Sequence, residues 1–347
     1  MFQLATLYAG IAGKVRPPVA IVMGSPRQAA ELAALCPAGD VVCFQMDLHQ
    51  SERLREELVL TSRDARVETK PDLWDIGLDF QTVLFPSPMH GERELKLDLL
   101  EQSLQILQTH GQFIALSEYE DDQLLPKALK KVFGKYSSTP ASRDGAAFWS
   151  VKEKDKRRRR HEMTFHARVH QGPSHAFVSQ PGVFSYGRLD DGARALLEVA
   201  KIEAGNSILD LGCGVGTNGI LAADRAGLNA PITFVDSNVR AIALAEQNAR
   251  DNGLVHFTSI ASSTLSLPPA SFDVILANPP YYAASTIAKM FIELSRPLLK
   301  KGGRFYLVTK QVEHVAPFVV ELYGEVDAYE NRGYTVIEAI PGETHDR

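Results

Sequence analysis

The sequence is organised around residues 207–219, where a short apolar run leads directly into closely spaced glycines. Ile208, Leu209 and Leu211 predict a buried strand, and residues 220–226 predict a helix. The glycines between them give a turn in which the backbone can touch a ligand that any Cβ atom would exclude. A strand that runs through a glycine turn into a helix opens a doubly wound α/β fold, with the ligand at the carboxyl end of the strand.

Two classes of ligand fit such a turn. Gly214, Gly216 and Gly219 satisfy the pattern G-x-G-x-x-G, which on its own would indicate NAD. Asp210 precedes the glycines, at a place where its carboxylate can meet the ammonium of an amino-acid ligand. Residues 278–281, Asn-Pro-Pro-Tyr, follow a later strand. Together these features resemble the S-adenosylmethionine site of a class I methyltransferase.

Bulk composition narrows the setting. A length of 347 residues fits about two domains at ~150 residues each, and 45% hydrophobic with 23% charged residues is ordinary for a soluble protein. The net charge of −5 argues against bulk electrostatic binding of nucleic acid, so we expect any such contact to be local. Cys36, Cys43 and Cys213 lack paired metal spacing, which predicts reduced thiols and no metal site. No apolar run approaches ~18 residues, and we expect a cytoplasmic protein that is neither secreted nor inserted in a membrane.

The first half alternates strands and helices, which predicts a parallel sheet. We expect a helix over residues 95–108, ended by Gly111. Further helices are expected over residues 28–35 and 51–60, and strands over 19–23, 41–45, 65–68, 82–85 and 113–117.

The second half repeats this order. Residues 20–24 correspond to 208–212, and residues 83–88 correspond to 275–280. The first copy has lost the chemistry, because only Gly24 remains of the glycine cluster and Pro-Ser-Pro replaces Asn-Pro-Pro. We therefore interpret residues 1–150 as a degenerate domain that is structural or positions the substrate.

A basic run and a hairpin join the halves. Residues 152–161 are rich in Lys and Arg, and either a solvated linker helix or a patch that contacts phosphates fits them. Residues 164–169 and 176–179 flank a Gly-Pro turn and predict a small hairpin. These features assign residues 151–180 to the joint and 181–347 to the catalytic domain.

A family resemblance becomes specific from Pro181 onward. Pro-Gly-Val-Phe-Ser at 181–185, Leu-Asp-x-Gly at 189–192, the glycine turn and Asn-Pro-Pro-Tyr resemble, in order and spacing, the bacterial ribosomal RNA guanine-N2 methyltransferases, above all small subunit methyltransferase C. The resemblance spans nearly the whole chain. It implies an α/β fold of two tandem Rossmann-like class I methyltransferase domains, the N-terminal copy degenerate. It also implies S-adenosylmethionine as cofactor and ribosomal RNA or the small ribosomal subunit as partner; we expect a monomer.

The resemblance also implies which residues hold the cofactor. Gly212, Gly214 and Gly216 would shape the methionine and ribose pocket, with Asp210 near the ammonium. Asp236 ends an expected strand, 232–235, where an acidic side chain can accept both ribose hydroxyls. The alternative role of Asp236 is to cap the helix expected over 239–248. After the strand expected over 257–260, Ser262 or Ser263 stands where many relatives have an acidic residue for adenine.

The chemistry of residues 278–281 suits methylation of a planar nitrogen. The Asn278 side-chain oxygen and the Pro279 carbonyl can accept hydrogen bonds from the two N–H groups of an exocyclic amine, close to the bound cofactor. Tyr281 would stack on the ring of a base swung out of its helix. Tyr282 departs from the ribosomal RNA family, which usually has His after Phe there.

Alternative functions remain open at this point. Asn-Pro-Pro-Tyr also resembles enzymes that methylate a glutamine of release factors and enzymes that methylate adenine in DNA. A catalytically lapsed assembly factor that still binds the cofactor is a third hypothesis, and a dehydrogenase a fourth. The duplicated front half and residues 181–185 favour the ribosomal RNA interpretation.

Overall fold

The computed structural model describes residues 4–77, 79–87, 91–156, 161–280 and 284–342. The chain divides into two compact units, residues 1–161 and 162–347. The expected hairpin therefore belongs to the second unit.

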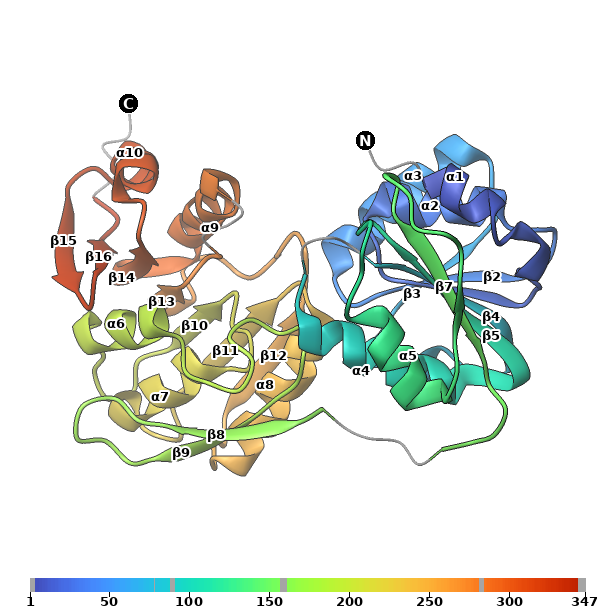
Figure 1. Ribbon diagram of the computed structural model, residues 1–347. Coiled ribbons are helices and arrows are strands. Elements are labelled where there is room, and N and C mark those ends of the chain that lie inside the picture. The colour runs from blue at the N-terminus through green and yellow to red at the C-terminus, as the bar shows by residue number, and fades with distance from the viewer. Residues whose placement is uncertain (1–3, 78, 88–90, 157–160, 281–283, 343–347) are drawn as a thin grey trace. The chain divides into compact units, whose positions relative to one another are not determined.

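The first unit is built on a seven-stranded sheet in the order β3-β2-β1-β4-β5-β7-β6 (Figure 1). Strands β1 to β5 are parallel and β7 is antiparallel to β5. The strands are β1 (Val19–Val22), β2 (Val41–Gln45), β3 (Arg66–Thr69), β4 (Phe80–Ser87), β5 (Leu107–Ser117), β6 (Ser137–Ser138) and β7 (Ala146–Val151). The helices are α1 (Leu4–Ala9), α2 (Pro26–Leu35), α3 (Leu48–Thr61), α4 (Arg93–Ile106) and α5 (Leu125–Phe133), with single 3₁₀ turns η1 (Ala12–Lys14) and η2 (Leu73–Ile76).

The second unit has the same strand order, β12-β11-β10-β13-β14-β16-β15. Its sheet strands are β10 (Ile208–Leu211), β11 (Ile232–Asp236), β12 (Phe257–Ala261), β13 (Phe272–Ala277), β14 (Leu299–Thr309), β15 (Val326–Asn331) and β16 (Tyr334–Ala339). Its helices are α6 (Asp191–Val199), α7 (Thr217–Ala226), α8 (Val239–Asp251), α9 (Ala284–Leu298) and α10 (Val312–Tyr323), and a separate hairpin pairs β8 (Met163–Ala167) with β9 (His175–Ser179). The two units are therefore two copies of one fold, as expected from the sequence.

Successive side chains of a strand point to opposite faces of the sheet, and helices cover both faces. Both sets of side chains are therefore buried. In β10, Ile208 joins the core cluster that includes α7 and α8, whereas Leu209 joins the cluster that includes α9 and α10. The register places the ends of the central strands level, with Leu211 opposite Val235 on one side and Ala277 on the other. The turns after β10, β11 and β13 therefore emerge at one edge of the sheet.

The prediction that Gly111 ends a helix was wrong, and the reason reinforces the repeat. Helix α4 ends at Ile106 and the chain enters β5 at once, with Gly111 inside the strand at a register shift. A Cβ on Gly111 would lie 2.9 Å from the carbonyl oxygens of Gln108 and Phe80. Gly303 occupies the same place in β14, where a Cβ would lie 2.9 Å from the carbonyl oxygen of Phe272. Both copies thus keep a glycine for a bulge in the fifth strand.

The turn after β1 is closed by the first unit's own residues. A Cβ on Gly24 would lie 2.5 Å from the ring of Pro86, which lies near the end of β4. Gln45, 1% exposed at the end of β2, donates from Nε2 to the Gly24 carbonyl at 3.2 Å. Pro86 and Gln45 therefore both contact Gly24 in the turn after β1.

The start of the basic run belongs to the first unit and is not a helix over residues 152–156. Lys152 is buried and donates from Nζ to the Leu107 carbonyl at 2.6 Å, and Lys156 donates to the Val132 carbonyl. These two lysines stabilise the sheet and α5 rather than extending into solvent. The arginines at 157–160 lie outside the described residues.

Several elements have no counterpart in the sequence-based expectation, namely α1, α5, α10 and the strands β6 and β7. None of the helices in the described part of the chain is both long and apolar enough to cross a membrane.

Candidate active site

The glycine turn after β10 is tied to the end of β11 through its backbone. The N–H groups of Gly212 and Cys213 donate to the Val235 carbonyl at 2.8 and 3.0 Å. The Gly214 N–H donates to Oδ2 of Asp236 at 2.9 Å. The turn is thereby held in one conformation before any ligand binds, which lowers the ordering cost of binding.

The three glycines predicted to shape the pocket have different surroundings, although each has a positive φ, between 53° and 85°. A Cβ on Gly212 would meet the Phe291 ring at 2.8 Å, and one on Gly216 would meet Ala245 at 3.2 Å. A Cβ on Gly214 would meet nothing within 4 Å. Gly212 and Gly216 are therefore needed for packing against α9 and α8, whereas Gly214 leaves open space above the turn.

Asp210 lies beneath this turn and is fully buried. Its Oδ2 accepts from the Gly219 N–H at 2.8 Å, which satisfies a donor in the first turn of α7, and its Oδ1 accepts from Nδ2 of Asn218 at 3.4 Å. Burial raises the pKa of Asp210 to about 7, although both hydrogen bonds oppose the rise. The carboxylate supports the loop, and its proximity to a ligand ammonium stays a prediction.

A small cavity lies over the turn, and Gly214, Thr217, Asn218 and Asn278 are among its lining residues. Asn218 is 4% exposed, and within the described residues its Oδ1 has no hydrogen-bond partner. A buried acceptor without a donor costs about 1–3 kcal/mol, which a cationic donor in the cavity would remove. Asn218 was missed in the sequence because it stands inside the glycine motif as an ordinary turn residue.

Asp236 lies at the edge of the turn and is half-buried. Its second oxygen, Oδ1, accepts from the Asn238 N–H at 2.9 Å. The alternative role for Asp236, capping the next helix, is wrong. Asn238 is the N-cap of α8 and accepts from the N–H groups of Arg240 and Ala241. The role of Asp236 toward ribose hydroxyls stays a prediction.

Ser262 follows β12, next to the end of β11. Its N–H donates to the Asp236 carbonyl at 3.0 Å, and its Oγ accepts from the N–H groups of Thr264 and Leu265. The hydroxyl therefore closes its own turn, and its predicted contact with adenine stays untested.

Residues 181–185 reach the cavity at their carboxyl end, and the start of the segment is anchored from α8 and its N-cap. Arg240, 1% exposed, donates to the Pro181 carbonyl at 2.5 Å, and Asn238 donates to the Gly182 carbonyl at 2.8 Å. Phe184 and Ser185 line the cavity; Phe184 is 43% exposed, and Ser185 has a φ of 59°, a conformation that costs a non-glycine residue energy.

Asn278 leaves the end of β13 and is 8% exposed. Its Nδ2 donates at 2.9 Å to Oδ2 of Asp190, the N-cap of α6. Pro279 is buried beside it. Tyr281 and Tyr282 lie outside the described residues. The sequence singled out Asp190 as part of a motif but gave it no role.

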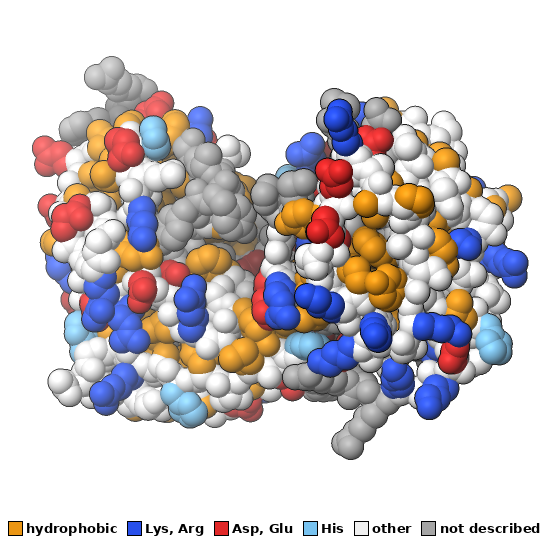
Figure 2. Space-filling view, viewed as in Figure 1, with side chains coloured by type: hydrophobic (Ala, Val, Ile, Leu, Met, Phe, Trp, Pro, Cys, Tyr) orange, Lys and Arg blue, Asp and Glu red, His pale blue; other side chains and the backbone are white. Residues whose placement is uncertain are grey.

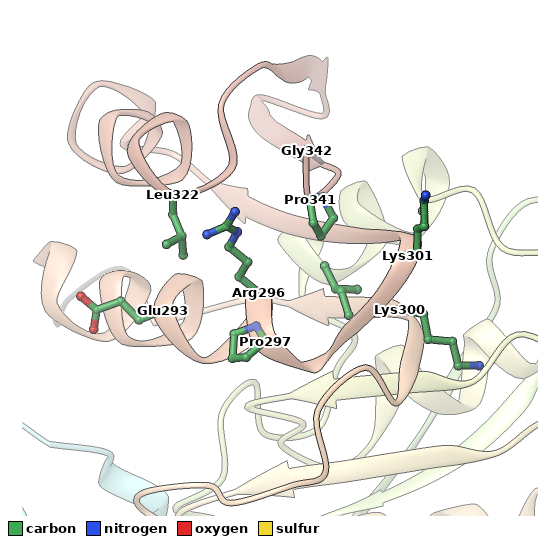
Figure 3. A pocket seen from close by; sticks show the side chains of 10 residues that line it. Glu293, Arg296, Pro297, Lys300, Lys301, Leu322, Pro341 and Gly342 are labelled. Carbon is green, nitrogen blue, oxygen red and sulfur yellow. The ribbon is translucent and has the colours of Figure 1, made fainter. Parts of the chain in front are cut away.

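A second, larger hollow of about 940 Å³ lies elsewhere in this unit, at the end of α9 (Figure 3). Arg296, Lys300 and Leu322 line it, and none of the glycine-turn residues does. It opens near the start of β14, whereas the turns after β10, β11 and β13 leave the opposite ends of their strands. By volume alone this hollow would be the candidate ligand site. The buried acceptor of Asn218 and the open space at Gly214 favour the smaller cavity instead.

The structure thus brings together most of the residues predicted from the sequence. Gly212, Gly214 and Asn278 line one cavity, and Asp210 and Asp236 bond to the backbone of its glycine turn. Gly216 and Ser262 are not among the residues that line it. An open glycine, a buried acceptor and nearby carboxylates fit a ligand with an ammonium group and vicinal hydroxyls, as S-adenosylmethionine has.

Comparisons with known proteins agree with this arrangement. Residues 174–338 match the family model of the methyltransferase small domain. An uncharacterised Bacillus subtilis protein, YbxB, is 31% identical over 215 residues, which cover 59% of this chain and 96% of that protein. The ribosomal RNA small subunit methyltransferase C of Chromohalobacter salexigens is 32% identical over 47% of this chain, and the alignment spans about half of that relative's length, 50%.

One solved structure matches along both units. It is a 16S rRNA N2 methyltransferase of T. thermophilus, in complex with AdoMet and guanosine. It has a TM-score of 0.75 and 19% identity, and it covers 97% of this chain and 92% of its own. This likeness shows the tandem class I methyltransferase fold. The match of residues 174–338 to the family model, together with the extent of the Bacillus subtilis match, shows that this chain belongs to the methyltransferase small domain family; it is a class I, S-adenosylmethionine-dependent methyltransferase.

Proposed function

We propose that this chain methylates the exocyclic N2 amine of a guanine in ribosomal RNA, most specifically the 16S RNA of the small subunit. The observation that carries the proposal is the Asn278 carboxamide, fixed at the end of β13 beside the open glycine turn. The names of two relatives, a small subunit methyltransferase C and a 16S rRNA N2 methyltransferase, support the same substrate.

Four residues have defined tasks at the cofactor. S-adenosylmethionine, when bound, supplies an electrophilic methyl group on a sulfonium sulfur. Gly214 leaves room for it, Asn218 offers a buried acceptor toward its ammonium, and Asp236 accepts from its ribose. Burial raises the pKa of Asp210 to about 7, and a cation bound above the turn would favour its charged form.

The chain's task at the acceptor is to make a poor nucleophile reactive. The lone pair of an exocyclic amine is delocalised into the ring, so the amine must be oriented. The Asn278 side-chain oxygen and the Pro279 carbonyl accept hydrogen bonds from the two N–H groups of the amine. These hydrogen bonds direct the lone pair of the nitrogen at the methyl carbon. A new N–C bond forms as the C–S bond breaks, the electron pair stays on sulfur, and the nitrogen then loses one proton to solvent. Asn278 stabilises the positive charge that grows on the nitrogen.

The charge distribution agrees with an RNA substrate held by local contacts. Lys127, Lys130 and Lys131 are exposed along α5 of the first unit, and Lys135 follows them. Figure 2 shows Lys and Arg side chains gathered over part of this unit. A degenerate domain with a basic helix fits the proposed role of positioning the RNA backbone, although the net charge is −5.

The test is transfer of labelled methyl groups from S-adenosylmethionine to purified ribosomal subunits, naked 16S RNA or release factors in parallel. We expect label in ribosomal RNA, recovered as N2-methylguanosine after digestion. Label in release factors would instead support a glutamine methyltransferase. Binding of S-adenosylmethionine without transfer to any substrate would support a lapsed assembly factor.

A further inference from the structure

We propose that Asp190 is a positioning residue for catalysis, and that it fixes the Asn278 carboxamide with its oxygen toward the acceptor amine. This inference rests on the proposed function of Asn278. The two residues lie 88 positions apart in the chain, and their side chains are joined by a 2.9 Å hydrogen bond from Nδ2 of Asn278 to Oδ2 of Asp190. Both line the cavity over the glycine turn.

The partner decides which end of the amide faces the substrate. A carboxamide has an acceptor oxygen and a donor nitrogen at opposite ends of one plane, and rotation by 180° exchanges them. A carboxylate can only accept, so Asp190 selects the orientation in which the nitrogen of Asn278 points to it. The oxygen then points away from Asp190. The reverse orientation would present N–H groups to the N–H groups of an amine, which cannot be methylated in that pose.

The carboxylate is itself fixed by the backbone. Oδ2 of Asp190 also accepts from the Ala193 N–H at 3.0 Å, as the N-cap of α6. The first turn of α6 therefore places the oxygen that holds Asn278, so the orientation of the amide is set by a helix end rather than by a mobile side chain. The negative charge of Asp190 next to Nδ2 of Asn278 also increases the electron density of the Asn278 oxygen. This strengthens the hydrogen bond from the reacting amine to that oxygen.

The decisive variant is Asp190→Ser, because serine is a good N-cap but is too short to hold Asn278. Unfolding by urea should show a stability close to that of the wild type, and kcat is measured at saturating S-adenosylmethionine, so that a change in the Kd of the cofactor does not enter the comparison. We expect kcat for methyl transfer to fall about 10- to 100-fold, the usual cost of removing a group that orients a functional side chain. An unchanged kcat in a stable Asp190→Ser protein would overturn the proposal.

A double-mutant cycle separates positioning from a merely structural role. If Asp190 acts through Asn278, Asp190→Ser should have almost no further effect on kcat in an Asn278→Ala background. Additive effects would mean that Asp190 acts elsewhere.

Exchanging the two side chains tests whether activity lost in a single variant can be restored. Asn278→Asp alone puts two carboxylates together and should be nearly inactive, whereas Asp190→Asn with Asn278→Asp restores one donor, one acceptor and the N-cap. We expect the double variant to be at least about tenfold more active than Asn278→Asp, because the effects of substitutions at two residues in contact are coupled. A double variant no better than the single one would contradict the pairing.

The pair can also be checked without catalysis. The side-chain amide protons of Asn278, assigned by their loss in Asn278→Ala, should shift and exchange faster with solvent in Asp190→Ser by nuclear magnetic resonance. If the wild type methylates no guanine but this shift occurs, the proposed function fails while the pair stands. If methylation occurs without the shift, the pair fails alone.

Discussion

Replacing Asp210 by Asn should make the second unit more stable near neutral pH. Asn keeps an oxygen for the Gly219 N–H, now 2.8 Å from Oδ2, and brings an amide donor for the Asn218 Oδ1, which lacks a partner within the described residues. Rotation of the Asn218 carboxamide brings that oxygen to the place where its Nδ2 now lies, 3.4 Å from Asp210. The variant therefore mimics the protonated form of Asp210, which burial favours.

The magnitude follows from the pKa. Burial raises the pKa of Asp210 from 3.8 to about 7, so the folded protein binds a proton that the unfolded chain has released over this range. Stability contributed by this group is therefore lost as pH rises from about 4 to about 7. The full difference is on the order of 4 kcal/mol. Asp210→Asn removes this loss, so its gain over the wild type should grow with pH and level off above pH 7.

Urea unfolding at pH 5, 6, 7 and 8, followed by far-ultraviolet circular dichroism, measures this gain. Both tryptophans, Trp74 and Trp149, lie in the first unit, so their fluorescence marks its transition separately. Taking the difference between variant and wild type at each pH cancels the other carboxylates. A variant that is no more stable at pH 8, or a difference that is constant from pH 5 to 8, would refute the reasoning.

The same substitution should weaken cofactor binding, since the sequence-based role of Asp210 is to place negative charge near the ammonium. We expect Kd for S-adenosylmethionine to rise about tenfold, equivalent to ~1.4 kcal/mol. Calorimetric titration of both proteins at pH 8 checks this. An unchanged Kd would leave Asp210 with only its structural role.

Three further substitutions test the cavity. Gly214→Val should abolish the binding of S-adenosylmethionine measured by calorimetry. The control is Gly205→Val, at a glycine with a φ of 84° and equally open surroundings, which should carry a similar backbone strain of ~1–2 kcal/mol and still bind the cofactor. Equal affinities of the two variants would exclude Gly214 from the site. Asp236→Asn should raise Kd about 10- to 100-fold, because the lost charge-assisted bonds are worth ~1.5–3 kcal/mol, and an adenosine competitor should lose affinity in parallel; a loss for S-adenosylmethionine alone would move Asp236 away from the ribose. Asn278→Ala should lower kcat about 10²- to 10³-fold in single-turnover assays and leave Kd nearly unchanged; a change confined to Kd would make Asn278 a binding residue only.

The fold could be predicted because buried strands and amphipathic helices alternate regularly in the sequence. The bounds of β2, 41–45, agree with the expectation, whereas the end of α4 does not. Gly111 resembled a helix terminator in the sequence because the reason for this glycine is a tertiary contact. It forms a bulge against the carbonyl of Phe80, which lies in the neighbouring strand β4. Local patterns do not contain such contacts.

The site was predicted only in part for the same reason. Motifs located Gly214 and Asn278 because their chemistry is local to a turn and a strand end. Asp190 and Asn218 acquire their significance from a partner 88 residues distant and from an unpaired oxygen in a cavity. The N-cap pattern at Asp190, followed by a helix beside the glycine turn, is the signal from which its position could have been inferred.

The central claim is that this chain methylates a guanine of ribosomal RNA at the site between the glycine turn and Asn278. It is tested most directly by mapping modified nucleotides in ribosomal RNA from cells that lack the chain and from the same cells that carry either the wild type or Asn278→Ala. We expect one N2-methylguanine of the small subunit to be missing, restored by the wild type and not by the variant. An unchanged set of N2-methylguanines in the cells that lack the chain would contradict the claim.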